Sequence, residues 1–144
     1  SFELEKKLEA SGDMERLEMV KDIASLANVF SVRQKNPRGL GHAVLCAKSF
    51  VGDEPFAILL GDDIVVNKNG KTATQQLVEA YEEFGGSVVG VQKVADSQVH
   101  KYGIIDPKEN LTERCASVKG FVEKPKLEDA PSNFAILGRY VLTP

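Results

Sequence analysis

Two adjacent carboxylates, Asp62 and Asp63, follow a short apolar run at residues 55–60. The run lies between Pro55 and Gly61, a pattern typical of a strand buried on both faces. In an open parallel sheet, ligands bind outside the carboxyl ends of the strands. Because Mg²⁺ is commonly held by one or two carboxylates together with substrate phosphates, the pair suits a hard cation and a phosphate-bearing ligand. A turn or a helix cap would use aspartate equally well, and both interpretations stay open on this run alone.

A glycine-containing loop after residue 34 is the second candidate. It carries Gly39 and Gly41 but lacks the third glycine of a dinucleotide fingerprint and the Gly-Lys-Ser/Thr of a P-loop. Such glycines let the backbone approach a flat ligand closely. The amide of Gln34, at the end of the preceding segment, can both donate and accept hydrogen bonds at a pyrimidine edge. The alternative is a loop that needs glycine only for a positive φ.

The third candidate is Glu123-Lys124-Pro125, at the end of an apolar segment. A carboxylate can bind a sugar hydroxyl, and a lysine ammonium can bind a phosphate as a point charge. A solvated strand end is the alternative. His42 and His100 are isolated and lack metal-ligand spacing, which argues against a zinc site.

The elements that position these residues follow from periodicity and turn signals. Two amphipathic helices are predicted before residue 28, the first capped by Ser1. A strand at 28–34, a helix at 43–50 and the strand at 55–60 form a βαβ unit, which predicts parallel strands. A helix through Phe84, with Thr72 as its cap, then precedes a strand at 87–94. Extended segments without long helices between them predict an antiparallel or mixed lobe over residues 102–106, 116–123 and 133–142.

Composition limits the class of protein. The 144 residues fit one domain, and the net charge of −3 provides no electrostatic footprint for nucleic acid or an anionic membrane. No apolar run is long enough to span a bilayer. Two cysteines are too few for a disulfide framework. We therefore expect a cytoplasmic protein without nucleic-acid or membrane partners. The first residue is not Met and the last residues directly follow a predicted strand, so we expect a fragment.

Several segments occur in a characteristic order along essentially the whole chain: Val32-Arg33-Gln34, Gly39-Leu40-Gly41-His42-Ala43, Leu59-Leu60-Gly61-Asp62-Asp63-Ile64, Tyr102-Gly103, Phe121-Val122-Glu123-Lys124-Pro125 and Gly138-Arg139-Tyr140-Val141-Leu142. In this order the chain resembles the bacterial UTP–glucose-1-phosphate uridylyltransferases (UDP-glucose pyrophosphorylases), within the wider sugar-phosphate nucleotidyltransferase family. No single segment is decisive, but their joint order and spacing are specific.

The resemblance implies an α/β, Rossmann-like fold, here incomplete, with a parallel or mixed sheet flanked by helices and a smaller β lobe for the sugar. Residues 1–144 would be a partial nucleotidyltransferase domain, with the nucleotide-binding part at about 1–95 and the sugar-binding part at about 96–144. The implied reaction is Mg²⁺-dependent attack of a glucose 1-phosphate oxygen on the α-phosphorus of UTP, which gives UDP-glucose and pyrophosphate. Positioning and charge neutralisation then supply most of the catalysis.

The resemblance also implies roles for individual residues. Gln34 and Gly39 would bind the uracil edge. Asp62 would hold Mg²⁺ between the nucleotide and sugar phosphates. The glucose hydroxyls would contact Gly103 and Glu123, and Lys124 would bind the sugar phosphate, which makes Asp62 and Lys124 the catalytic pair. His42 and Asp63 lie in matched segments without an implied role.

Two departures from the family pattern affect activity. The chain lacks the Gly-rich loop, with its Arg and a following Lys, that grips the triphosphate in the family, and a second acidic metal ligand is expected beyond Tyr140. We therefore expect these 144 residues alone to be catalytically inactive and the full-length enzyme to be a homo-oligomer. The alternatives are another sugar-phosphate nucleotidyltransferase, such as a thymidylyltransferase, or a non-catalytic regulatory protein that binds a nucleotide sugar.

Overall fold

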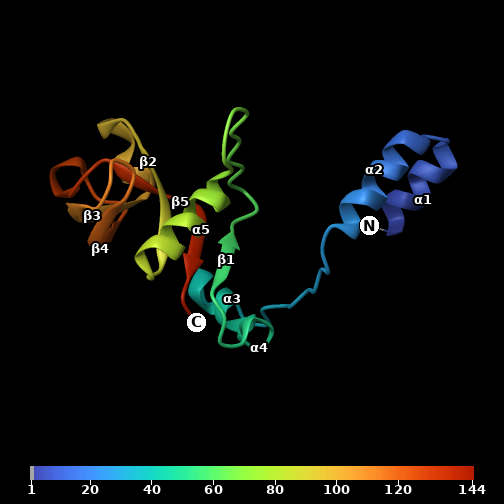
Figure 1. Cartoon of the computed structure of the whole chain (residues 1–144), viewed down its shortest axis with the longest axis horizontal. Helices are drawn as coiled ribbons and strands as arrows, with labels where there is room; N and C mark the ends of the chain where they lie inside the picture. The colour runs from blue at the N-terminus through green and yellow to red at the C-terminus, as the bar shows by residue number, and fades with distance from the viewer. Residues whose placement is uncertain (1) are drawn as a thin grey trace. The chain divides into compact units, whose positions relative to one another are not determined.

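Residues 2–25 form two helices that pack together, α1 (Phe2–Ser11) and α2 (Met14–Ser25), in this computed structural model, which describes residues 2–144 (Figure 1). Gly12 ends α1 with a φ of 73°, and the Asp13 carboxylate caps α2 by accepting a hydrogen bond from the Arg16 N–H at 3.2 Å. Both predicted helices are confirmed. The predicted cap Ser1 lies outside the described residues.

The strand predicted at 28–34 is wrong. These residues are irregular and pair with no strand of the described chain. A run of alternating apolar residues forms a strand only where a neighbouring strand pairs with its backbone N–H and C=O groups, and here the alternating residues Phe30 and Val32 stay exposed. The helix predicted at 43–50 is two short helices, α3 (Leu40–Cys46) and α4 (Lys48–Val51). Within residues 2–144, no helix has both the length and the apolar composition needed to cross a membrane.

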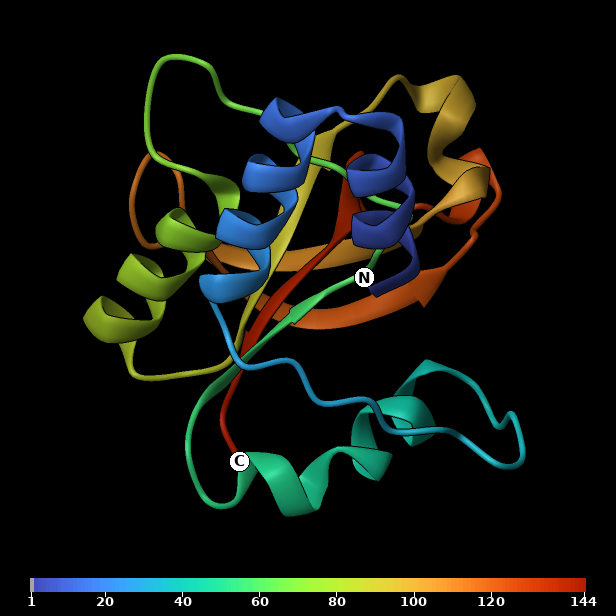
Figure 2. The same cartoon turned by 90° about the vertical axis from the view of Figure 1, so that its right-hand side faces the viewer.

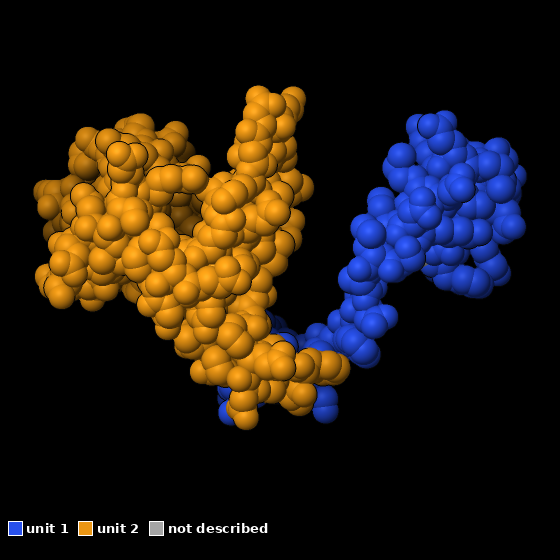
Figure 3. Space-filling model, in the orientation of Figure 1, with its two compact units in different colours: residues 1–48 blue, residues 49–144 orange. Residues whose placement is uncertain are grey.

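The chain divides into two compact units, residues 1–48 and 49–144, which Figure 3 colours separately. The first unit contains α1, α2 and α3. The second contains a five-stranded sheet and the longer helix α5 (Ala73–Phe84), with two short 3-10 helices, η1 (Asp96–Lys101) and η2 (Leu127–Asp129).

β5 (Phe134–Leu142) is the central strand of this sheet. It pairs antiparallel with β1 (Phe56–Leu59), β2 (Val88–Lys93) and β3 (Gly103–Asn110). β4 (Ala116–Glu123) adds to β3 as an antiparallel hairpin. Strands from both sides of residue 95 therefore share one sheet, and the three extended segments predicted after residue 100 are confirmed as strands.

The βαβ unit predicted over residues 28–60 is not formed, because residues 28–34 form no strand that could run parallel to β1. β1 and β2 run in the same direction, since both are antiparallel to β5, but β5 lies between them. Figure 2 shows β5 in red between β1 in green and β2 in yellow. The predicted burial of the 55–60 run on both faces is also wrong, because Leu59 is 56% exposed on a strand whose described neighbour is β5 alone. The sheet among the described strands is therefore antiparallel in its pairing, with β5 inserted between two strands of like direction.

Helix α5 covers part of the sheet and has strong local signals at both ends. Thr72 and Gln75 form a capping box, in which each side chain accepts a hydrogen bond from the other residue's backbone N–H. Gly85 ends the helix in the left-handed conformation, with a φ of 69°. Leu77 and Ala80 are buried, and α5 contacts β2 and β5. A core cluster of Val99, Ile104 and Ala135 packs η1 and β3 against β5.

Replacing Thr72 with alanine removes the side-chain half of this cap. We expect the free energy of unfolding to fall by about 1 kcal/mol, measured by urea denaturation. Thr74→Ala is the matched control, because it makes the same change inside α5, where alanine is a better helix former than threonine. Equal losses for the two variants would contradict a capping role for Thr72.

Candidate nucleotide and sugar-phosphate site

Asp62 lies in a tight turn directly after β1. The Leu60 N–H donates to the Gly138 carbonyl at 2.9 Å, and the Asp63 N–H donates to the Leu60 carbonyl at 3.3 Å, which closes the turn. Asp62 is exposed, and its carboxylate makes no hydrogen bond or ion pair with any described residue. The turn therefore presents one carboxylate with both oxygens available.

Asp63, the neighbouring carboxylate, is used differently. Its Oδ2 accepts a hydrogen bond from the Gly138 N–H in β5 at 2.7 Å. Arg139 donates to the carbonyls of Leu60 at 3.1 Å and of Gly138 at 2.7 Å, and also to the carbonyl of Asp63. The sequence left two interpretations open for this pair, a turn residue or a cation ligand. Asp63 serves the turn, whereas Asp62 is the carboxylate that is available to a ligand.

The donor chemistry of Asp62 fits Mg²⁺. The ion is a hard cation that prefers oxygen ligands and is usually bound through one or two carboxylates plus phosphates and water. In the described part of the chain, no group of three or more His, Cys, Asp or Glu residues could hold a metal ion by itself. A Mg²⁺ ion at Asp62 would thus take most of its ligands from a phosphate-bearing substrate and from water.

Glu123 and Gly103 face one another across the β3–β4 ladder. A Cβ added at Gly103 would lie 3.2 Å from Glu123 Oε2 and 3.1 Å from Ile136 Cδ1. Both separations are tighter than ordinary van der Waals contact, so the glycine leaves room for the carboxylate at the end of β4. The structure therefore brings together the two residues for which the family resemblance implies contacts with sugar hydroxyls.

Lys124 follows Glu123 and has a φ of 45°. Among the described residues, it is the only one other than glycine with a positive φ. A left-handed conformation costs an ordinary residue roughly 1–2 kcal/mol. The Lys124 N–H bonds to the Tyr102 carbonyl at 3.0 Å, and buried Pro125 follows, so both flanks hold the strained residue. Its Nζ lies 3.4 Å from Glu123 Oε1, but both side chains are mostly exposed, so this ion pair adds little stability.

Tyr140 of β5 is a residue to which the sequence assigned no role. It pairs with Ile58 of β1 and Val89 of β2. Burial raises the pKa of its phenol above the ordinary value of 10.0, and the negative charges of Glu123 and Asp63 raise it further. The hydroxyl stays protonated at neutral pH, and both carboxylates lie within electrostatic range of it. Tyr140 lies in the segment 138–142, which contributes to the family resemblance, but the resemblance implied no role for any residue of that segment.

Gln34 and Gly39 lie in the first compact unit, where they form a small hydrogen-bonded group with His42. Gln34 Nε2 lies 2.6 Å from His42 Nδ1 and 3.3 Å from the Gly39 carbonyl. Gly39 has a φ of 90°, a conformation that favours glycine, and precedes the first residue of α3. The positive φ predicted as an alternative for this loop is confirmed at Gly39, and His42 gains a local contact with Gln34.

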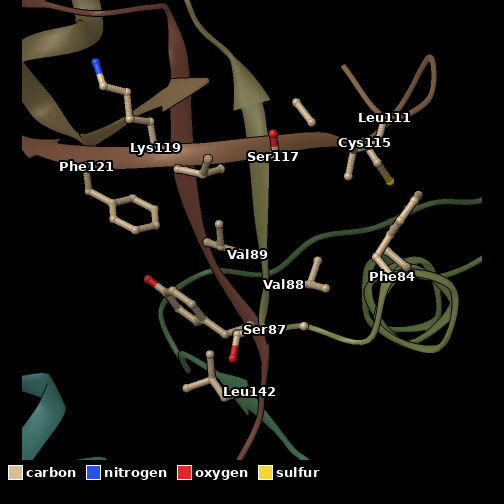
Figure 4. Close-up of a pocket in the computed structure, with 15 residues that line it drawn as sticks. Phe84, Ser87, Val88, Val89, Leu111, Cys115, Ser117, Lys119, Phe121 and Leu142 are labelled. Carbon is tan, nitrogen blue, oxygen red and sulfur yellow. The ribbon is translucent and has the colours of Figure 1, made fainter. Parts of the chain in front are cut away.

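A separate cavity of about 710 Å³ lies in the second unit (Figure 4). Its labelled walls include Phe84, Val88, Leu111 and Phe121, and its charged side chain, Lys119, forms an ion pair with Asp106 at 3.3 Å. None of the six residues predicted to bind substrate or metal lines it. Its apolar walls are unsuited to binding a phosphate group.

The described residues match the model of the nucleotidyl transferase family over residues 2–144, and the chain belongs to this family. It is 58% identical over 142 residues to a UTP–glucose-1-phosphate uridylyltransferase 2 of Staphylococcus saprophyticus and 54% identical over 144 residues to the UTP–glucose-1-phosphate uridylyltransferase of Bacillus subtilis. These matches cover 99% and 100% of this chain but 48% of each relative. The chain thus spans about half the length of the curated relatives it matches.

Solved structures agree with this assignment. A UDP-glucose pyrophosphorylase complexed with UDP-glucose is 38% identical, with a TM-score of 0.85 over 93% of this chain and 50% of its own. A UTP-bound enzyme of the same kind from Acinetobacter baumannii is 40% identical, with a TM-score of 0.85 over 99% of this chain and 51% of its own. The predicted α/β nucleotidyltransferase fold is confirmed, and the roles of the individual site residues stay predictions.

A side chain at Gly138 would force its neighbours to shift, because an added Cβ would lie 2.8 Å from Leu60 Cβ and 3.1 Å from Asp63 Cβ. We expect Gly138→Ala to lower the free energy of unfolding by about 1–3 kcal/mol through overpacking, measured by urea denaturation. Gly120→Ala in β4 is the control, since a Cβ there meets nothing within 4 Å. If Gly138→Ala lowers the free energy of unfolding no more than Gly120→Ala does, the turn is not closely packed against β5 at Gly138.

Lys124→Gly should relieve the left-handed strain. We expect the free energy of unfolding to rise by up to about 1 kcal/mol, since the greater freedom of glycine in the unfolded chain offsets part of the gain. Lys126→Gly is matched to it, because Lys126 is also an exposed lysine but has a φ of −67°. The free energy of unfolding of that control should fall by about 0.5–1 kcal/mol, measured by thermal denaturation. Destabilisation by both changes would contradict strain at Lys124.

Proposed function

We propose that this chain is part of a UTP–glucose-1-phosphate uridylyltransferase, which makes UDP-glucose and pyrophosphate from UTP and glucose 1-phosphate. The observation that carries the proposal is 58% identity over 99% of the chain to a relative of that name. The relatives crystallised with UTP and with UDP-glucose support the same substrate and product. The proposal includes a cytoplasmic location and a homo-oligomeric full-length enzyme.

The reaction is a nucleotidyl transfer. A phosphate oxygen of glucose 1-phosphate attacks the α-phosphorus of UTP, a new P–O bond forms, and the bond to the β-phosphate breaks as pyrophosphate leaves. Negative charge accumulates where two phosphate groups approach one another. The protein must therefore align the two substrates and neutralise that charge.

Asp62 and Lys124 are the residues we propose for this task. Bound Mg²⁺ would neutralise phosphate charge, and the free carboxylate of Asp62 would hold it. Lys124 would bind the phosphate of the sugar through its ammonium group, and its strained backbone fits a functional role, since such conformations cluster at ligand sites. Glu123, beside Gly103, would accept hydrogen bonds from glucose hydroxyls.

Gln34 and Gly39 would recognise the uracil. The Gln34 amide donates within the group it forms with His42 and Gly39, which fixes its orientation. Its carbonyl oxygen then stays available to accept a hydrogen bond from the base. Gly39, whose positive φ favours glycine, has no side chain that would lie between this backbone and a flat ligand.

Isothermal titration of the chain with UDP-glucose, with and without Mg²⁺, tests the proposal. We expect Mg²⁺ to strengthen binding, Asp62→Ala to remove that dependence, and Lys124→Ala to weaken binding roughly tenfold or more, as for a lost charge-assisted hydrogen bond. Lys126→Ala removes a nearby exposed lysine and serves as the control. Titration with dTDP-glucose distinguishes a uridylyltransferase from the alternative, a thymidylyltransferase, which would bind dTDP-glucose more tightly than UDP-glucose. No binding by a folded wild type, or equal effects of Lys124→Ala and Lys126→Ala, would count against these roles.

A further inference from the structure

We propose that Asp63 is a positioning residue: with Gly138 and Arg139 it fixes the turn that presents Asp62 to a divalent cation. This inference rests on the proposed function, since it assumes that Asp62 is the carboxylate that binds the metal. Asp63 itself would contribute no bond to the ion. Its carboxylate is committed to the backbone of β5 through the 2.7 Å hydrogen bond from the Gly138 N–H.

The turn is attached to β5 at both ends. On its first side, the Leu60 N–H donates to the Gly138 carbonyl at 2.9 Å. On its last side, Asp63 accepts from the Gly138 N–H. One residue of the central strand thus anchors both Leu60 and Asp63, and only Gly61 and Asp62 lie between them.

Arg139 adds a second attachment from the next residue of β5. Its guanidinium donates to the carbonyls of Leu60 and Gly138 and to the carbonyl of Asp63. Because these acceptors are backbone carbonyls, the side chain of Arg139 holds the turn rather than facing a phosphate. A lysine has one ammonium in place of the planar fork of donors and cannot reproduce this set of bonds.

Close packing completes the attachment. An added Cβ at Gly138 would lie 2.8 Å from Leu60 Cβ and 3.1 Å from Asp63 Cβ, so the turn lies directly against the strand. A carboxylate held between two such anchors loses little conformational freedom when it binds a cation. Groups that orient a metal ligand in this way typically change metal affinity 10- to 100-fold when they are mutated.

The test measures metal binding directly, without turnover. Mn²⁺, used as a paramagnetic substitute for Mg²⁺, is titrated into the 144-residue chain with saturating UDP-glucose, and free Mn²⁺ is followed by electron paramagnetic resonance. The informative pair is Asp63→Ala, which removes the acceptor for the Gly138 N–H, and Asp63→Asn, which keeps an oxygen acceptor but loses the charge. Asp53→Ala removes an exposed carboxylate from the loop before β1 and serves as the control.

We expect Asp63→Ala to weaken Mn²⁺ binding by about 10- to 100-fold, whereas Asp63→Asn and the Asp53→Ala control stay within a few-fold of wild type. Asp62→Asn should abolish the same signal. Arg139→Lys gives an independent reading if Asp63→Ala does not fold, and it should also weaken Mn²⁺ binding. Circular dichroism establishes that each variant is folded.

The results separate this inference from the proposed function. No Mn²⁺ binding by wild type, or undiminished binding by Asp62→Asn, would overturn the metal role of Asp62 and the positioning role with it. If Asp62→Asn loses Mn²⁺ binding but Asp63→Ala binds Mn²⁺ with wild-type affinity, the positioning role of Asp63 alone is overturned. If Asp63→Asn loses as much affinity as Asp63→Ala, the charge of Asp63 is what matters, and it acts on the metal directly rather than through the turn.

Discussion

The close approach of the 60–63 turn to Gly138 is the contact on which the candidate site depends. Gly138 lies in β5, which is also the strand that joins β1, β2 and β3 into one sheet. A side chain at this position would meet Leu60 at 2.8 Å, so the turn can rest on the strand only where the strand has no Cβ. The same strand therefore organises the sheet and sets the position of the exposed carboxylate.

Two adjacent aspartates acquire opposite uses from this contact. Asp63 faces β5 and is bound by a backbone N–H, whereas Asp62 has no partner among the described residues. A similar division occurs at the end of β4, where buried Pro125 anchors the chain beside exposed Glu123 and Lys124. In both places a residue that holds the backbone is next to an exposed charged residue, which keeps the charged group in place at the surface.

Local signals predicted much of what positions these residues. Helices α1, α2 and α5 follow from apolar spacing and from caps within a few residues, such as the Thr72–Gln75 box and Gly85. The strands after residue 100 also follow from their composition. Such features depend on neighbours along the chain, and the six candidate residues could be selected because their types and order resemble one family. The prediction of a strand at 28–34 was wrong, because alternating apolar and polar residues do not by themselves provide a neighbouring strand to pair with.

Sequence by itself determined where the helices and most strands lie, which charged residues end them, and the family to which the chain belongs. Only the tertiary structure decided that β5 lies between β1 and β2, because pairing joins residues from 41 (Lys93 and Phe134) to 86 (Phe56 and Leu142) positions apart that no local pattern relates. For the same reason it alone distinguished Asp62 from Asp63. Two identical side chains carry the same local signal, and their roles diverge only where Gly138 and Arg139 approach one of them from a distant part of the chain.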